Sequence, residues 1–239
     1  MDRIILHCDL NNFYASVETI LHPEYKGKPI AVCGDPKKRH GIVLAKSQPA
    51  KIMGVKTGDT VWQAQQKCPD ITIVPPTFPE YVRYSEEVFN IYTSYTDRVE
   101  HFGLDECWLD VTESVKLFGD GKTIADTVRR RVYEETGLTI SVGVSFTKSF
   151  AKLGSDLKKP DATTVISREN YKNVVWPLNA GEMINVGRST LKRLNKLNIF
   201  TLGDLAHADR ALLKSHFGII GERLIDCANG TEPDPVKYY

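Results

Sequence analysis

Two adjacent carboxylates, Asp105 and Glu106, stand between two apolar runs in the segment HFGLDECWLDV at residues 101–111. Carboxylates this close repel each other unless a cation neutralises them or their pKa values rise. A third carboxylate, Asp9, ends the apolar run RIILHCDL at residues 3–10. If the two segments are neighbouring strands of one sheet, the three side chains meet at one edge. Such oxygen ligands suit hard divalent cations such as Mg²⁺, and two cations there can promote phosphoryl transfer.

The same residues also allow simpler interpretations. A lone Asp-Glu pair is more often a solvated hairpin turn, and spacing alone does not place Asp9 beside Asp105. Asp110 is expected to be a structural, hydrogen-bonding carboxylate. The six histidines show no metal-ligand spacing, so His7 on the first apolar run is expected to pack in the core.

Hydrophobic patterning predicts the elements that would position these side chains. Apolar runs predict strands at residues 3–10, 26–34, 41–47, within 69–80 and at 138–145, with a β-hairpin over 99–111. Helical spacing predicts helices at residues 11–21, 49–54, 80–98, 121–136 and 148–159. From about residue 168 to 230 only short helices and Gly turns are expected. The chain is therefore predicted to be an α+β protein with a boundary near the Pro-rich break at 69–80 and a small all-α region at its end.

Composition excludes few functions. The 239 residues carry 31 Lys and Arg against 30 Asp and Glu, so any contact with a polyanion must come from a local patch. The five cysteines are irregularly spaced without a CxxC pair, which is typical of a reduced cytosolic protein. No signal peptide or membrane span is expected, and the predicted location is cytoplasmic.

One predicted helix has a basic face that could bind nucleic acid. In VGRSTLKRLNKLN (186–198), leucines line one side, and the other side carries Arg188, Lys192, Arg193 and Lys196 without an acid. Gly187 precedes the helix, so exposed backbone N–H groups could receive a phosphate. The segment FGIIGERL (217–224) suggests a second Gly hairpin of the same type. Without other support, a basic helical face is equally well a solvated surface.

Several motifs together resemble the Y-family DNA polymerases of the DinB or polymerase IV type. They are DLNNFYASVE (9–18), GLDECWLDV (103–111), SVGVSFTKSFAKLGSDLKKPD (141–161), INVGRSTLKRLNKLNIFTLGDLA and FGIIGERLIDCANG. The likeness covers essentially the whole chain in the right order, which is far more specific than any single motif. It implies a translesion polymerase with a palm of mixed or antiparallel sheet flanked by helices, small α/β fingers and an all-α helix-hairpin-helix thumb.

The resemblance also implies a domain organisation and partners. The palm would be residues 1–10 and 78–166, the fingers 11–77 and the thumb 167–235. A DNA-gripping little finger would follow in the family and is expected to be absent here, with truncation favoured over a naturally short protein. Expected partners are primer-template DNA, deoxyribonucleoside triphosphates and a sliding clamp bound through the missing C-terminal region. A monomer that does not bind membranes is expected.

The resemblance assigns roles to individual residues. Two Mg²⁺ ions would be bound by Asp9, Asp105, Glu106 and the carbonyl of Leu10. Tyr14 would be the steric gate that excludes a ribose 2′-hydroxyl, with Phe13 as its aromatic neighbour, and Lys159 would bind the triphosphate. The simpler role for Tyr14 is core packing.

The fingers depart from the family pattern at SQPAK (47–51). Gln48 stands where the family usually has Tyr, and Lys51 where it has Arg. Both are expected at the triphosphate, but Lys is a point charge and cannot fork two oxygens as Arg does. Gly103 replaces a frequent Ser, with a minor expected effect. The loop residues Lys37, Lys38 and Arg39 could touch template or triphosphate, or be solvated.

Two other functions are compatible with parts of the sequence. A catalytically weak or inactive DNA-binding protein could retain the polymerase fold, and the altered SQPAK segment leaves this alternative open. An intact acidic cluster argues against it, because a non-enzyme need not keep that costly arrangement. A nucleotide cyclase-like palm enzyme could use the same two-metal layout, but the thumb helices and Tyr14 argue against it.

Overall fold

The computed structural model describes residues 2–35 and 41–238, and it divides into two compact units. The first unit comprises Met1–Asp9, Tyr92–Arg131 and Ile140–Tyr239. The second unit comprises Leu10–Ile91 and Val132–Thr139. Both units are built from segments that are distant in sequence.

A five-stranded mixed sheet in the order β5-β6-β1-β7-β8 forms the centre of the first unit. Its strands are β1 (Ile5–Leu10), β5 (Val99–His101), β6 (Glu106–Asp110), β7 (Ile140–Ser145) and β8 (Thr163–Val165). Strand β6 is antiparallel to both β1 and β5, whereas β7 and β8 run parallel. Every residue of β1 and β7 is buried, as expected for apolar runs in central strands. The predicted hairpin over 99–111 is confirmed as β5–β6.

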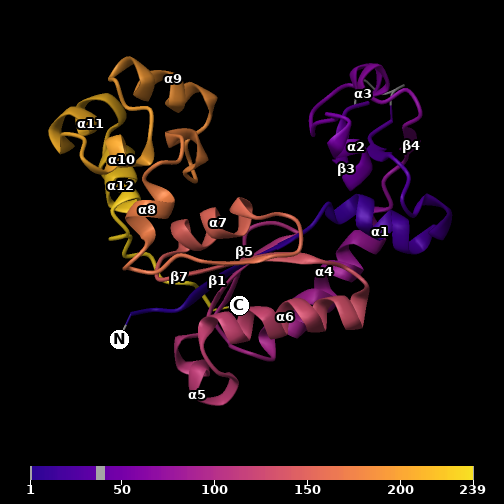
Figure 1. Ribbon diagram of the computed structural model, residues 1–239, viewed down its shortest axis with the longest axis horizontal. Coiled ribbons are helices and arrows are strands. Elements are labelled where there is room, and N and C mark those ends of the chain that lie inside the picture. Colours follow the sequence, from indigo (N-terminus) through magenta and orange to yellow (C-terminus); the bar gives the residue numbers. More distant parts are fainter. Residues whose placement is uncertain (1, 36–40, 239) are drawn as a thin grey trace. The chain divides into compact units, whose positions relative to one another are not determined.

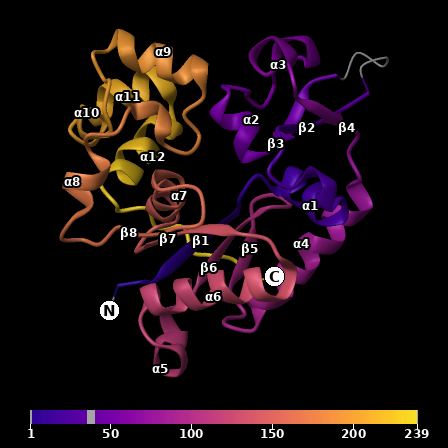
Figure 2. The same cartoon turned by 45° about the vertical axis from the view of Figure 1, so that its right-hand side comes forward.

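Helices cover both faces of this sheet (Figure 1). In both views α6 (Gly121–Thr136) lies on one face and α7 (Lys148–Leu157) on the other (Figure 2). The short η3 (Thr112–Ser114) and α5 (Val115–Phe118) connect β6 to α6. Helix α7 approaches β7 so closely that a Cβ at Gly143 would lie 1.9 Å from the carbonyl oxygen of Ala151. Glycine at 143 therefore permits the close contact that brings the lysines of α7 to the sheet.

The second unit contains a small three-stranded sheet in the order β3-β2-β4. Its elements are α1 (Phe13–Leu21), η1 (Pro23–Tyr25), β2 (Ile30–Cys33), β3 (Val43–Lys46), α2 (Gln48–Ile52), α3 (Val61–Lys67), β4 (Thr72–Val74) and most of α4 (Phe78–Thr93). Strand β2 is antiparallel to β3 and parallel to β4. The core of this sheet and its helices includes small residues such as Ala31, Ala50 and Ala64.

The C-terminal region of the first unit is helical (Figure 1). It contains α8 (Tyr171–Val175), η4 (Ala180–Glu182), α9 (Arg188–Lys196), α10 (Leu202–Ala206), α11 (Arg210–Phe217) and α12 (Ile219–Ala228). Gly218 joins α11 to α12 in the left-handed region, at φ +64°. A Cβ at Gly221 would lie 2.4 Å from the carbonyl oxygen of Leu213. These two glycines allow the tight hairpin that the sequence predicts at residues 217–224.

The predicted α+β class, mixed sheet and helical C-terminal region are confirmed. Several helices differ from their predictions: the helix predicted at 80–98 is Phe78–Thr93, and the one at 49–54 is Gln48–Ile52. The helices predicted at 11–21 and 148–159 are Phe13–Leu21 and Lys148–Leu157, and Val61–Lys67 and Val115–Phe118 were not predicted. Lys37, Lys38 and Arg39 lie outside the described residues. Among the residues that are described, no helix is long and apolar enough to cross a membrane.

Candidate active site

The acidic site of the first unit is built on the pairing of β1 with β6. Asp9 and Glu106 are direct partners in the antiparallel register, so the two carboxylates start from neighbouring backbone positions. Asp105 precedes β6 in the bend of the hairpin and is half-buried. Asp9 is 4% exposed, a degree of burial that requires a compensating partner for a charged group. The predicted meeting of the two strands is confirmed.

Two lysines neutralise these carboxylates. Lys152 Nζ lies 2.9 Å from Glu106 Oε1 and 3.5 Å from Asp9 Oδ2. Lys159 Nζ lies 2.5 Å from the same Asp9 oxygen. Asp156 lies within 3.5 Å of Lys152 and 2.8 Å of Lys159. The site is therefore a partly buried network of alternating charges where β1 ends and β6 begins.

Burial and charge act against each other on the pKa values in this network. Burial raises the pKa of Asp9, and the nearby charge of Glu106 raises it further. Lys159 and Lys152 act to lower this pKa but do not outweigh burial. Burial and the charge of Glu106 likewise raise the pKa of Asp105. Burial also acts to raise the pKa of Glu106, but its partners His7 and Lys152 lower it overall. Perturbed carboxylates of this kind concentrate at functional sites.

His7 supports Glu106 from the core. It is fully buried, as the sequence predicts, and its Nε2 lies 3.4 Å from Glu106 Oε2. Its Nδ1 is 2.8 Å from Ser155 Oγ, and its ring packs edge-on against Trp108. Burial lowers the pKa of His7, which favours the neutral ring. Helix α7 and the sheet thus fix His7 behind the acidic site.

The donors present are those that a divalent cation prefers. Carboxylate oxygens are hard ligands, but Glu106 Oε2 is buried against His7 Nε2 at 3.4 Å and Glu106 Oε1 contacts Lys152. Across residues 2–35 and 41–238, however, no three His, Cys, Asp or Glu side chains are arranged to hold a metal ion. The predicted convergence of three carboxylates within metal-sharing distance is therefore not present in these side-chain positions. Buried carboxylates need positive partners, and Lys152 and Lys159 supply them here.

Lys152 was not predicted as a site residue. Its signal was the spacing of Lys148 and Lys152, four apart on one helical turn, with Lys159 further along the same basic segment. Lys148 makes a separate two-oxygen ion pair with Glu100, at 2.8 Å to each oxygen. Asp110 accepts hydrogen bonds from Thr112 and is structural, as predicted.

In the second unit, Tyr14 lies in a cluster of aromatic rings. It is half-buried on α1 and stacks on Tyr81 of α4, with ring centres 4.2 Å apart and planes within 10°. Phe78 meets Tyr14 edge-on at 6.1 Å, and Phe13 lies 5.4 Å from it. Leu10 ends β1 and is buried. The ring of Tyr14 is thus held against a wall of aromatic side chains.

The altered fingers segment lies on α2. Gln48 starts this helix, and its Oε1 is buried with no hydrogen-bond partner among the described residues. Lys51 is exposed on the same helix. The hydroxyl of Ser47, just before the helix, is used by the chain itself, because it accepts from Ile30 N–H and donates to the carbonyl of Lys28.

The basic residues of α9 differ in what they contact. Gly187 caps the helix without a side chain, and Arg188, Lys192 and Lys196 are exposed. Arg193 is also exposed, but its guanidinium lies over the ring of Phe217 at 4.3 Å and donates to the carbonyl of His216. Its guanidinium therefore links α9 to α11 within the helical region, and these contacts favour a structural role.

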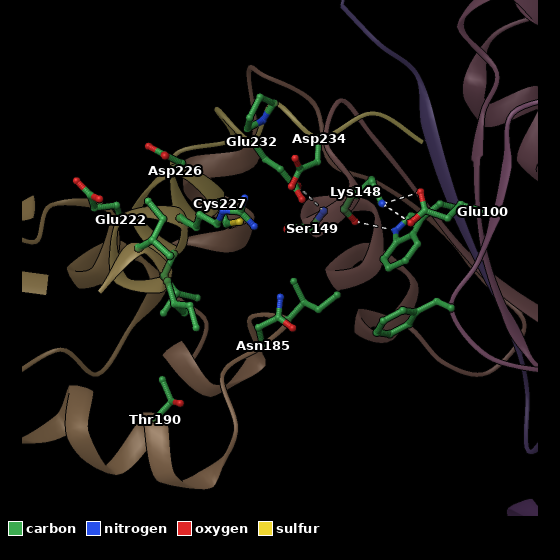
Figure 3. Close-up of a pocket in the computed structure, with 18 of the residues that line it drawn as sticks. Glu100, Lys148, Ser149, Asn185, Thr190, Glu222, Asp226, Cys227, Glu232 and Asp234 are labelled. Carbon is green, nitrogen blue, oxygen red and sulfur yellow. Dashed lines mark hydrogen bonds and ion pairs between the residues drawn. The ribbon is translucent and has the colours of Figure 1, made fainter. Parts of the chain in front are cut away.

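A cavity of about 890 Å³ lies between the β5–β6 hairpin, the start of α7 and helix α12 (Figure 3). Figure 3 shows the Lys148–Glu100 pair on one wall, with Glu232 accepting from the backbone N–H of Ser149. None of the described residues that line it is Asp9, Asp105 or Glu106. The cavity is thus separate from the acidic site.

Residues 8–156 match the model of the impB/mucB/samB family, and the chain belongs to this family. The resemblance of its motifs to the Y-family DNA polymerases of the DinB type is confirmed.

Curated and solved relatives carry related names. The DNA polymerase IV of Acetivibrio thermocellus is 54% identical over 99% of this chain, which spans 59% of that protein. The crystal structure of DinB from Sulfolobus solfataricus is 30% identical with a TM-score of 0.88, covering 98% of this chain and 69% of that one. An insertion ternary complex of Dbh DNA polymerase matches at 30% identity and a TM-score of 0.90, with the same two coverages.

Proposed function

We propose that the protein is a template-directed DNA polymerase of the translesion class. It would add deoxyribonucleotides from their triphosphates to a primer 3′-hydroxyl, releasing pyrophosphate. The observation that carries the proposal is the direct pairing of Asp9 with Glu106 across β1 and β6, bridged by Lys152. Family membership and the DNA polymerase IV relative support it.

Asp9, Asp105, Glu106 and the carbonyl of Leu10 would hold the Mg²⁺ ions that this family implies. Bound there, Mg²⁺ would supply Lewis acidity and neutralise charge developing on the phosphates. Lys159 is well suited to a second role, because it follows the end of α7 on a flexible stem. Its ammonium, now on Asp9, could move to the leaving phosphates. Lys152 would stay beside Glu106 and offset the repulsion between carboxylates.

The remaining site residues are proposed from the family pattern. Tyr14, five residues after Asp9, would be the steric gate, with Phe13 beside it. Gln48 and Lys51 would contact the triphosphate from α2. Gln48 Oε1 supports this role because it is a buried acceptor without a partner in the described chain.

The domain assignments remain part of the same proposal. Residues 1–10 and 78–166 would be the palm, 11–77 the fingers and 167–235 the thumb. Gly187, Arg188, Lys192 and Lys196 of the thumb would contact DNA backbone phosphates, which position a duplex without reading its sequence. A sliding clamp partner and a monomeric state are proposed on the family resemblance alone.

The decisive experiment is primer extension with Mg²⁺ on undamaged and lesion-bearing templates, comparing the parent with Asp105→Ala. We expect incorporation by the parent and none by the variant. Incorporation that persists in Asp105→Ala would refute the site. The matched control is Asp110→Asn, a buried carboxylate on β6 that is outside the proposed site.

A DNA-binding protein without catalysis is the second candidate, favoured by the Gln48 and Lys51 departures and by the lysines that occupy the carboxylates. Salt-dependent DNA binding by a folded parent, with no incorporation at any Mg²⁺ concentration or by a longer chain that includes a little finger, would favour it over polymerisation.

A further inference from the structure

Glu18 is a buried acidic side chain that the proposed reaction does not use. It lies on α1, is 1% exposed, and forms no ion pair with a lysine or arginine of residues 2–35 and 41–238. Its Oε1 accepts from the hydroxyl of Tyr81 and, at 3.2 Å, from the backbone N–H of Thr77. Burying a carboxyl without a cation is costly, so a site that keeps one needs these hydrogen bonds.

The partner of Glu18 is the same tyrosine on which the proposed gate stacks. Tyr14 and Glu18 are four residues apart on α1, so they share one face of the helix. Tyr81 contacts both residues. Its hydroxyl donates a hydrogen bond to Glu18, and its ring stacks on that of Tyr14 with ring centres 4.2 Å apart. Phe78, one turn earlier on α4, packs edge-on against both rings. The contacts form a closed loop between two helices.

This loop removes freedom from the Tyr81 ring. Tyr81 is fully buried, and burial together with the Glu18 hydrogen bond raises the pKa of its hydroxyl, which therefore stays protonated as a donor. A ring fixed at its hydroxyl end and packed on its face cannot rotate away from Tyr14. Small displacements of a positioning group can change reaction rates strongly.

We infer that Glu18 is a positioning residue for sugar selection, because it anchors the ring of Tyr81 that backs the Tyr14 gate. This inference rests on the proposed function for its enzymatic consequence. The gate excludes a 2′-hydroxyl only while its ring is held in place. Loosening the wall behind Tyr14 therefore admits ribonucleotides without touching the acidic site.

The enzymatic test is single-nucleotide insertion with matched ribo- and deoxyribonucleotides, measuring kcat and KM for each. Glu18→Ala and Tyr81→Phe should each raise the relative efficiency of ribonucleotide insertion about tenfold, mainly through a lower ribonucleotide KM. Glu18→Gln should stay near the parent, because its amide oxygen can accept the same two hydrogen bonds. In a Tyr14→Ala background, Glu18→Ala should add nothing, since coupled residues are non-additive.

A second measurement does not depend on activity. With 3-fluorotyrosine placed at position 14, the fluorine resonance should shift or broaden in Glu18→Ala and Tyr81→Phe but not in Glu18→Gln. If Glu18→Ala does not fold, Tyr81→Phe decides, because it keeps the ring and removes only the hydroxyl.

Several results would overturn the inference. The first is an unchanged preference for deoxyribonucleotides in the folded Glu18→Ala and Tyr81→Phe variants. The second is a tenfold rise in ribonucleotide insertion when Glu18→Ala is added to Tyr14→Ala. The third is a fluorine resonance at position 14 that does not change in Glu18→Ala or Tyr81→Phe. A parent that inserts no nucleotide would instead defeat the proposed function, and the fluorine signal would still decide whether Glu18 holds the gate ring.

Discussion

The two units bury carboxylates in different ways. In the first unit, Asp9 and Glu106 are neutralised by the ammonium groups of Lys152 and Lys159. In the second unit, Glu18 is satisfied by a tyrosine hydroxyl and a backbone N–H. Lysine ammonium groups sit on long flexible stems and can be exchanged for other cations. The donors around Glu18 belong to a packed ring and to the backbone, so they cannot leave.

This difference separates the proposed catalytic carboxylates from a carboxyl with a proposed supporting role. Carboxylates held by movable charges can accept a metal ion or release a lysine to a phosphate. A carboxyl held by fixed neutral donors can only position its neighbours. Burial alone is similar in the two places, since Asp9 is 4% and Glu18 1% exposed. The kind of partner, rather than the depth, therefore predicts which acid takes part in chemistry.

The largest effect should follow loss of a reactive carboxylate. Asp9→Asn keeps an acceptor for Lys159 but removes the charge, so nucleotide insertion should fall by roughly 10³-fold. Rates from single-turnover primer extension would measure this. Glu18→Gln, the equivalent change in the second unit, should leave deoxyribonucleotide insertion within about twofold of the parent, given its non-reactive role. Comparable losses of nucleotide insertion in Asp9→Asn and Glu18→Gln would contradict the distinction between catalytic and supporting carboxyl groups.

Removal of the gate ring should have the next largest effect. Tyr14→Ala should raise ribonucleotide insertion relative to deoxyribonucleotide insertion by roughly 10²-fold, because the 2′-hydroxyl no longer meets a ring. The ratio of kcat/KM for the two sugars is the measurement. An unchanged preference would assign Tyr14 to packing against Tyr81 and Phe78 instead.

A substitution at Lys152 tests whether the stability of the first unit depends on the lysines that neutralise its carboxylates. Lys152→Met should destabilise the metal-free protein by about 1–3 kcal/mol near pH 7, since Glu106 loses a charged partner. Thermal or urea unfolding with EDTA would measure it, and exposed Lys158→Met is the matched control. A loss as large in Lys158→Met would show that helix composition, and not the ion pair, is responsible.

The pH dependence of that effect has a definite sign. The pKa of folded Glu106 is lowered from its ordinary value of 4.5; although burial opposes this, His7 and Lys152 outweigh it. Its stabilising contribution is therefore present above pH 4.5 and is lost as the pH falls through the lower folded value. The difference between the parent and Lys152→Met should shrink over this acid range. A difference that grows on acidification would contradict the assignment.

The fold and the acidic pair could be predicted because their signals are local. Apolar runs marked β1 and β7, and the hairpin placed Asp105 and Glu106 at its bend. Helix α3 was missed because VWQAQQK has few apolar residues, and its start depends on the capping box of Thr60 and Gln63.

Other contacts depend on how distant segments pack. Lys152 reaches Glu106 because Gly143 lets α7 lie close to β7, and no local pattern reveals that approach. Glu18 was visible only as part of a motif, because its partner Tyr81 is 63 positions away. Arg193 is exposed, as its helical spacing predicts, but that spacing cannot show that its guanidinium packs on the ring of Phe217.

The smallest effects are expected for the basic residues of α9. Lys192 has an ammonium on a flexible stem, whereas the guanidinium of Arg193 is held by Phe217 and His216. Lys192 is exposed, so Lys192→Ala should weaken DNA binding modestly and reduce the slope of log affinity against log salt by about 1. Arg193→Ala should leave that slope unchanged but lower thermal stability, because the guanidinium packs on Phe217 and bonds the carbonyl of His216. Fluorescence anisotropy across a salt series and thermal unfolding would separate the two. If Arg193→Ala reduces the salt slope as Lys192→Ala does, the Arg193 charge acts on DNA despite its contacts with Phe217 and His216, and such contacts no longer distinguish DNA-binding charges from structural ones.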